Sequence, residues 1–86
     1  MRWYVYLLRC GNGALYTGIS IDVATRVQQH QAGKGSSYVR QHGAQAVVYS
    51  ERHRTKSAAM KRECEIKGWT RRKKLGLFGT RLVPSA

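Results

Sequence analysis

The chain of 86 residues contains short apolar runs separated by polar or glycine-rich segments. Residues 3–8 form a continuous aromatic and aliphatic run, which predicts a strand buried on both faces. Residues 15–19 and 46–50 are rich in β-branched, aliphatic and aromatic side chains and predict two further strands. Between the first two strands, residues 9–14 include two glycines and Asn12, which tolerate the positive φ of a tight hairpin turn.

A first helix is predicted over residues 23–31, directly after the second strand. Ser20 and Asp22 precede it, and both are residue types that cap helix N-termini. Residues 32–43 contain three glycines and two adjacent serines, so we expect a long loop there.

Two more helices follow the third strand. Thr55 or Ser57 caps the longer one, which continues to about residue 67 and ends before Gly68. Thr70 caps a last short helix that ends at residue 74 or 75.

The element order β-β-α-β-α-α predicts an α+β fold, a three-stranded sheet flanked by helices. A chain of this length buries roughly 60–65% of its unfolded surface, so the core is small and there is one domain. We expect this single domain to span residues 1–78, with a frayed tail over residues 79–86.

The length of the hairpin loop decides where Tyr16 lies relative to Tyr6. A three-residue loop would place Tyr6 opposite Gly18 and Tyr16 diagonally beside Tyr6, on one face of the sheet. A two-residue turn would send Tyr16 to the other face. Two phenols on one face, with open space opposite at Gly18, could form the floor of a pocket. Taken alone, two tyrosines packed in a sheet core are the simpler interpretation.

The first helix places an arginine and a histidine at the edge of its apolar stripe. At about 100° per residue, Arg26 and His30 fall beside Val23 and Val27, which must face the sheet. A desolvated, unpaired charge is costly, so Arg26 needs an anionic partner. A phosphate held by two hydrogen bonds would serve, and a salt bridge to Asp22 or Glu63 is the alternative.

The second predicted helix separates two glutamates. Glu63 shares an apolar stripe with Ile66, whereas Glu65 points away into solvent. A carboxylate in such a seam suits a hard cation such as Mg²⁺, which often takes only one or two carboxylates together with water and substrate phosphate. The alternative is an ion pair of Glu63 with Arg26 or Lys67.

The net charge of +12 lies mostly in the second half of the chain, since residues 52–74 hold ten Lys and Arg against two Glu. Such an excess indicates a polyanionic partner, with nucleic acid first and an anionic membrane surface second. A solvated basic face is the simpler alternative.

Cys10 and Cys64 are the only cysteines, and no secretory context accompanies them. We expect two reduced, buried thiols in a cytoplasmic protein, with Met60 filling the core beside Cys64. The cysteines and histidines lack the paired short spacings of a zinc site.

No apolar run is long enough to span a bilayer, and no secretory signal precedes the first strand. His53 is expected at the surface, and Trp69 in the core or at its rim, where it could stack on a base.

In order and spacing, Tyr4-Val5-Tyr6, Tyr16-Thr17-Gly18, Arg26, His30 and Glu63 resemble the motifs of the GIY-YIG nuclease superfamily, in particular its small stand-alone bacterial members. The resemblance covers about residues 3–77. It extends to Gly35 with Tyr38 in the predicted loop, and to the stretch 63–67. Two departures are Tyr-Val-Tyr in place of Gly-Ile-Tyr, and Ile19 where larger relatives carry a lysine.

The resemblance implies the same element order and a metal-dependent nuclease that hydrolyses phosphodiester bonds in DNA. It implies that Tyr6 and Tyr16 line the site, that one of them is the general base, and that Arg26 stabilises the transition state with help from His30. Glu63 would hold one Mg²⁺ or Mn²⁺ ion. A phenol with a pKa of about 10 is a poor base at neutral pH. We therefore expect Arg26, His30 and the metal to lower that pKa.

We expect DNA, which could be single-stranded or branched, as the partner, and infer no obligate protein partner and no membrane. Cations and one tyrosine outside the catalytic set are expected to bind the nucleic acid: Lys34, Tyr38, Arg40, Lys67, Arg71, Arg72, Lys73 and Lys74. The main alternative is a binding module that keeps the fold without catalysis, and a basic accessory protein of the ribosome or nucleoid is a third. The inward glutamate favours the enzyme, because binding alone would not need it.

Overall fold

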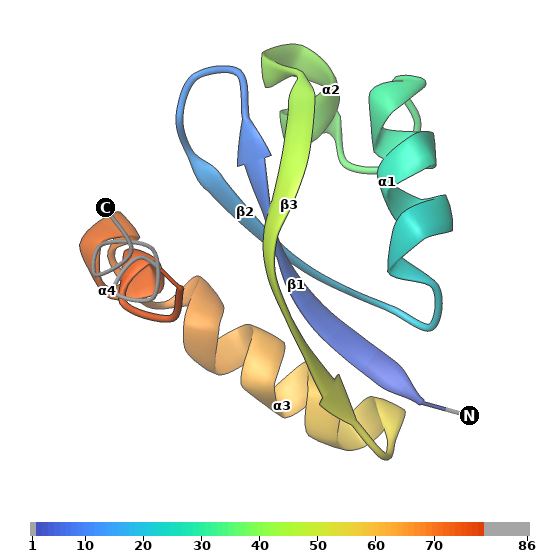
Figure 1. The fold of residues 1–86 in the computed structure, drawn as a ribbon, viewed down its shortest axis with the longest axis vertical. Coiled ribbons are helices and arrows are strands. Elements are labelled where there is room, and N and C mark those ends of the chain that lie inside the picture. The colour runs from blue at the N-terminus through green and yellow to red at the C-terminus, as the bar shows by residue number, and fades with distance from the viewer. Residues whose placement is uncertain (1, 79–86) are drawn as a thin grey trace.

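The computed structural model describes residues 2–78, so the predicted tail from residue 79 lies outside the described part of the chain. Three antiparallel strands form one sheet in the order β2-β1-β3, and helices pack on both of its faces (Figure 1). The predicted α+β class is confirmed. The elements are β1 (Trp3–Cys10), β2 (Leu15–Ser20), α1 (Val23–Gln31), α2 (Ser37–His42), β3 (Ala44–His53), α3 (Lys56–Lys67) and α4 (Arg71–Leu75).

The central strand β1 contributes to a separate core on each face of the sheet. Val5 and Leu7 pack with Ala59 and Ile66 of α3. The alternate residues Tyr6, Leu8 and Cys10 pack on the other face with Val39 of α2 and with the two valines of α1. This alternation explains the continuous apolar run in β1, because both faces of the strand are covered.

The hairpin register confirms the three-residue loop. Tyr6 pairs with Gly18 and Leu8 pairs with Tyr16, so Tyr6 and Tyr16 share a face. The Cys10 amide donates a hydrogen bond to the Ala14 carbonyl at 2.9 Å and closes the loop.

The polar helix caps formed as predicted. Asp22, Thr55 and Thr70 each accept a hydrogen bond from the backbone amide three residues later, at 3.1, 3.1 and 3.2 Å. These contacts fix the first turns of α1, α3 and α4. No helix within residues 2–78 is long and apolar enough to cross a membrane.

The structure adds one helix to the predicted order and lengthens one strand. The loop predicted over residues 32–43 contains α2, whose single buried side chain is Val39. One aliphatic residue in a six-residue helix leaves no periodic pattern to detect. β3 continues to His53, past the predicted end at residue 50, because its polar end still pairs with the first residues of β1.

Candidate active site

The Tyr6 side chain lies flat against the backbone of β2 at Gly18. A Cβ at position 18 would stand 2.5 Å from the Tyr6 hydroxyl oxygen and 2.6 Å from Cζ. The space at Gly18 is therefore filled by the Tyr6 ring and is not the open space that the sequence suggested. Tyr6 is only 1% exposed, so the packing of β2 fixes the position of its ring.

The Tyr6 hydroxyl and His30 form a buried pair between β1 and α1. Tyr6 Oη and His30 Nε2 are 3.0 Å apart, and His30 is 2% exposed. His30 Nδ1 has no hydrogen-bond partner within residues 2–78. The predicted histidine is therefore fully inside the site rather than at the edge of the buried face.

Gly35 seals the other side of the histidine ring. It has φ +93°, a conformation that favours glycine, and a Cβ there would lie 3.3 Å from His30 Nδ1 and 3.5 Å from Arg26 Nη2. The half-buried Arg26 also donates a hydrogen bond from Nη1 to Gln29 Oε1 at 3.0 Å. The loop after α1 therefore holds the guanidinium and the imidazole side by side.

Tyr16 contributes the half-buried aromatic ring of the cluster. It contacts His30 edge to face, with ring centroids 5.4 Å apart. Tyr6, in contrast, is fully buried. Of the two tyrosines that are candidates for the general base, Tyr16 is therefore the one nearer to solvent.

Glu63 lies on α3, which packs on the opposite face of the sheet from Tyr6. Its side chain is 18% exposed and pairs with Lys67 at 3.3 Å, as one of the sequence alternatives predicted. Its negative charge is the smallest of the causes that raise the pKa of Tyr6.

The protein alone does not produce the lowered phenol pKa that we expected. Burial raises the pKa of Tyr6 above 10.0, the neighbouring Arg26 guanidinium lowers it, and Tyr16 and Glu63 raise it further. Burial, followed by the charge of Arg26, lowers the pKa of His30 below its ordinary value. Both groups are therefore neutral at neutral pH, and a hydrogen bond between neutral partners joins them.

The proposed DNA-binding residues occupy several separate places. Lys34 and Arg40 are exposed, and the 43%-exposed Tyr38 accepts a hydrogen bond from Asn12 Nδ2 at 3.1 Å. Lys67 is the partner of Glu63.

Two of the four basic residues of α4 anchor the helix to the hairpin. Arg71 Nε donates to the Gly13 carbonyl at 2.8 Å, and Lys74 Nζ donates to the Leu15 carbonyl at 2.9 Å. Lys73 lies over the Trp69 ring, 4.5 Å from its centroid, and Arg72 is exposed. The half-buried Trp69 thus lies at the rim of the core, in contact with a cation.

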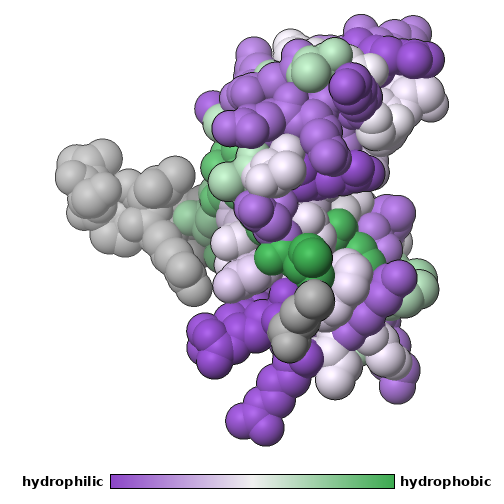
Figure 2. Space-filling model, turned by 90° about the vertical axis from the view of Figure 1, so that its right-hand side faces the viewer, coloured by the Kyte–Doolittle hydropathy of each residue, from purple (hydrophilic) through white to green (hydrophobic). Residues whose placement is uncertain are grey.

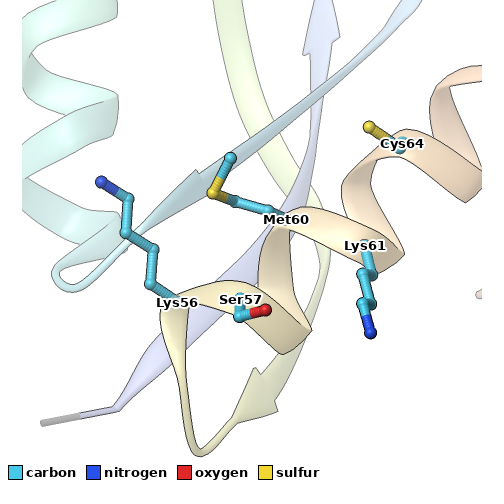
Figure 3. A pocket seen from close by; sticks show the side chains of 5 residues that line it. All are labelled: Lys56, Ser57, Met60, Lys61 and Cys64. Atoms are coloured by element: carbon cyan, nitrogen blue, oxygen red, sulfur yellow. The ribbon is translucent and has the colours of Figure 1, made fainter.

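Two side chains of α3 that we expected in the core lie outside it. Met60 is 48% exposed and Cys64 is exposed, whereas Cys10 is buried as predicted. Figure 3 shows Met60 and Cys64 projecting from the same side of α3, and both line an open pocket together with Lys56, Ser57 and Lys61. Ala59 and Ile66 instead turn towards the sheet, about a third of a turn away from this side of the helix.

A second polar cluster joins β3 to α3 and was not predicted. Glu51 accepts hydrogen bonds from Tyr49 at 2.7 Å and from Arg62 at 3.0 Å, and lies 2.6 Å from His53 Nε2. Burial raises the pKa of Glu51, but these three contacts lower it more strongly. His53 is therefore half-buried and paired rather than a free surface residue.

Residues 2–75 match the GIY-YIG catalytic domain family. This chain belongs to the GIY-YIG family. Over 78 residues, the GIY-YIG chain is 46% identical to UPF0213 proteins of Staphylococcus aureus strains Mu50 and N315, with 91% of this chain and 95% of theirs covered. The solution NMR structure of a UPF0213 protein from Bacillus halodurans has a TM-score of 0.56 at 42% identity, covering 90% of this chain and 82% of that one.

The predicted family is thereby confirmed, and it places the chain in a nuclease superfamily. The match ends at residue 75, so it includes every residue of the candidate site from Tyr6 to Glu63.

Proposed function

We propose that this GIY-YIG domain is a divalent-metal-dependent endonuclease that hydrolyses phosphodiester bonds in DNA. The convergence of Tyr6, Tyr16, Arg26 and His30 on one face of the sheet carries the proposal. At Gly18 a Cβ atom would overlap the Tyr6 ring, and at Gly35 it would crowd the His30 ring, so glycine at these positions permits the arrangement. A sheet core would not need a guanidinium beside a buried histidine, whereas a phosphate site would.

The residues present fit one Mg²⁺ or Mn²⁺ ion at Glu63. Within residues 2–78, no three His, Cys, Asp or Glu side chains come together as a metal cage. A single carboxylate oxygen donor is still a common protein contribution for Mg²⁺, with water and substrate phosphate completing the shell. A bound ion would stabilise charge on the phosphate and lower the pKa of a nearby water or phenol.

The protein side chains divide the remaining tasks by their exposure. Tyr16 is the better candidate to take a proton from the attacking water, because Tyr6 is buried and its pKa is raised. Tyr6 and His30 form a neutral pair that positions Tyr16 through the edge-to-face contact. Arg26 would bind a non-bridging phosphate oxygen and offset the negative charge that builds during attack.

The test is cleavage of labelled single-stranded, duplex, flap and junction DNAs in Mg²⁺ or Mn²⁺. Glu63→Gln should abolish cleavage while DNA binding persists or strengthens, because a negative charge near the phosphate is lost. Its fold should survive, since the partly exposed pair with Lys67 contributes at most about 1 kcal/mol. Glu65→Gln is the matched control on the same helix and should cleave normally, because Glu65 pairs with Arg62 at the surface.

Equal cleavage by wild-type protein and Glu63→Gln in Mg²⁺, or undiminished cleavage by both proteins in metal-scrubbed buffer, would rule out this metal site. One observation favours a non-catalytic binding module, namely that Tyr6 is fully buried with a raised pKa. That alternative predicts DNA binding without cleavage of any of the four DNA substrates. RNA is a further substrate to be tested.

A further inference from the structure

A second cationic site lies at the end of the sheet where β1 begins and β3 ends. Arg2, Arg52, His53 and Arg54 line a pocket of about 270 Å³ there. This is the lower end of the molecule in Figure 1, near the N-terminus. Figure 2 shows strongly hydrophilic side chains projecting at the same end. None of these residues belongs to the candidate active site.

The three arginines of this pocket have no carboxylate partner within residues 2–78, because the acidic residues of the chain are engaged elsewhere. Glu51 binds His53 and Arg62, and Glu65 also pairs with Arg62. The remaining two, Glu63 and Asp22, pair with Lys67 and cap α1, respectively.

Guanidinium groups that share one pocket repel each other unless an anion joins them. His53 is already paired with Glu51, so the arginines are left to bind this anion. Their planar guanidinium groups can each bind a phosphate through two parallel hydrogen bonds, so a phosphate is the anion that suits this pocket.

The strand register relates this pocket to the candidate active site. Tyr6 pairs with Ser50 and Tyr4 pairs with Arg52 across β1 and β3. Arg52 therefore lies on the same face as Tyr6, one row further along the sheet. From standard strand spacings, the two Cα atoms are on the order of 8 Å apart. Ser50 and Arg52 are both exposed, so a nucleic-acid strand can follow this path.

We propose that Arg2, Arg52 and Arg54 bind an internal phosphodiester of the substrate strand, one or two nucleotides from the bond that is cleaved. This assignment rests on the proposed nuclease function. The phosphate is internal rather than terminal because β3 lies at the edge of the sheet and Arg52 and Arg54 are exposed. The nucleic-acid strand can therefore continue past the pocket.

The first test measures binding alone and is independent of cleavage. Arg52→Gln/Arg54→Gln is compared with Arg9→Gln/Lys61→Gln, which removes the same charge from exposed positions outside the pocket. Binding of a fluorescent 12-nucleotide single strand is followed by anisotropy over a salt series without metal. Each neutralised phosphate contributes about −0.7 to the slope of log K against log salt, and both arginines contact the same phosphodiester, so the pocket variant should flatten the slope by about 0.7.

The control variant should keep the wild-type slope, and melting curves should show that both variants fold. Equal slopes in the two variants would overturn the proposal. If the pocket variant flattens the slope and the wild-type protein cleaves no DNA, the phosphate site stands and the proposed hydrolysis fails. If the protein cleaves DNA and the slope is unchanged, only the phosphate site fails.

The second test places the contact along the strand. Single neutral methylphosphonates are introduced within two nucleotides of the cleaved bond, and cleavage at that bond is measured. One position should slow the wild-type protein about tenfold, in line with a lost charge-assisted hydrogen bond, and should have no effect on Arg52→Gln/Arg54→Gln. Equal losses in both proteins at every position would overturn the assignment. A preference for a 5′-phosphate over a 5′-hydroxyl that disappears in the variant would overturn it too, in favour of a terminal phosphate.

Discussion

Replacing Gly18 with alanine would test whether the Tyr6 ring must lie against the backbone of β2. The new Cβ would stand 2.5 Å from the Tyr6 hydroxyl oxygen and 2.6 Å from Cζ, whereas packed carbon atoms prefer about 3.5–4.0 Å. The ring would have to move by about 1 Å. Tyr6 has little free space for this, being 1% exposed, and the movement would stretch its 3.0 Å contact with His30.

The expected cost has two overlapping parts. Overpacking a core costs about 1–3 kcal/mol, and leaving a buried group such as His30 Nε2 unsatisfied costs about 1–3 kcal/mol. We expect Gly18→Ala to lower the free energy of unfolding by about 2–4 kcal/mol, a large part of the roughly 4–13 kcal/mol typical of a chain this size. Urea unfolding followed by circular dichroism measures the change.

The control is Gly68→Ala, at the C-terminal cap of α3. Gly68 has φ −78°, and the nearest atom to its Cβ position is at an ordinary 3.5 Å, so stability should stay within about 0.5 kcal/mol of wild type. In a Tyr6→Val background, which removes the ring, Gly18→Ala should cost close to nothing. The same cost in both backgrounds, or a silent Gly18→Ala, would refute the reasoning.

Three further predictions concern the site and α4. Tyr16→Phe should slow cleavage by about 10²–10⁴ with little change in melting temperature, whereas Tyr6→Phe should lower the rate and also the melting temperature, because His30 loses its partner. Burial and a nearby guanidinium lower the pKa of His30 below 6.5. As the pH falls, His30 is therefore protonated in the unfolded state before it is protonated in the folded state, and the free energy of unfolding should decrease as the pH drops through about 6.5. His30→Gln should weaken this pH dependence of the urea unfolding midpoint, and an unchanged pH dependence would contradict the prediction. Arg71→Gln should cost about 0.5–1.5 kcal/mol of stability through the lost bond to Gly13, while Arg72→Gln should leave stability unchanged and flatten the salt slope for duplex DNA by about 0.9.

The sequence predicted the strands and the helix starts because local signals decide both. A continuous apolar run identified β1, and Asp22, Thr55 and Thr70 marked three helix N-termini that the structure confirms. The relation between Tyr6 and Tyr16 remained open in the sequence, because it depends on the length of one loop. The Tyr6–Gly18 pairing settled it.

Long-range packing explains what the sequence did not show. The inward rotation of His30 follows from the fit of Gly35 against its ring, and Gly35 lies in a segment without periodicity. Met60 and Cys64 are apolar in type, yet they face away from the sheet, because Ala59 and Ile66 already fill the space beneath α3. Residue type alone did not distinguish these two sides of the helix.

The distribution of charge shows most clearly why a count of cations does not locate a binding surface. The sequence favoured α4, where four basic residues follow each other, but Arg71 and Lys74 are engaged with backbone carbonyls of the hairpin. Burial and the nearby Lys67 also lower the pKa of Lys74, as expected for a cation held against the fold. In a chain with four acids, the cations that remain unpaired decide where a polyanion binds. The arginines at the end of β3 meet that condition, and the strand register places Arg52 on the same face of the sheet as Tyr6, so we expect the substrate strand to follow β3 past the site.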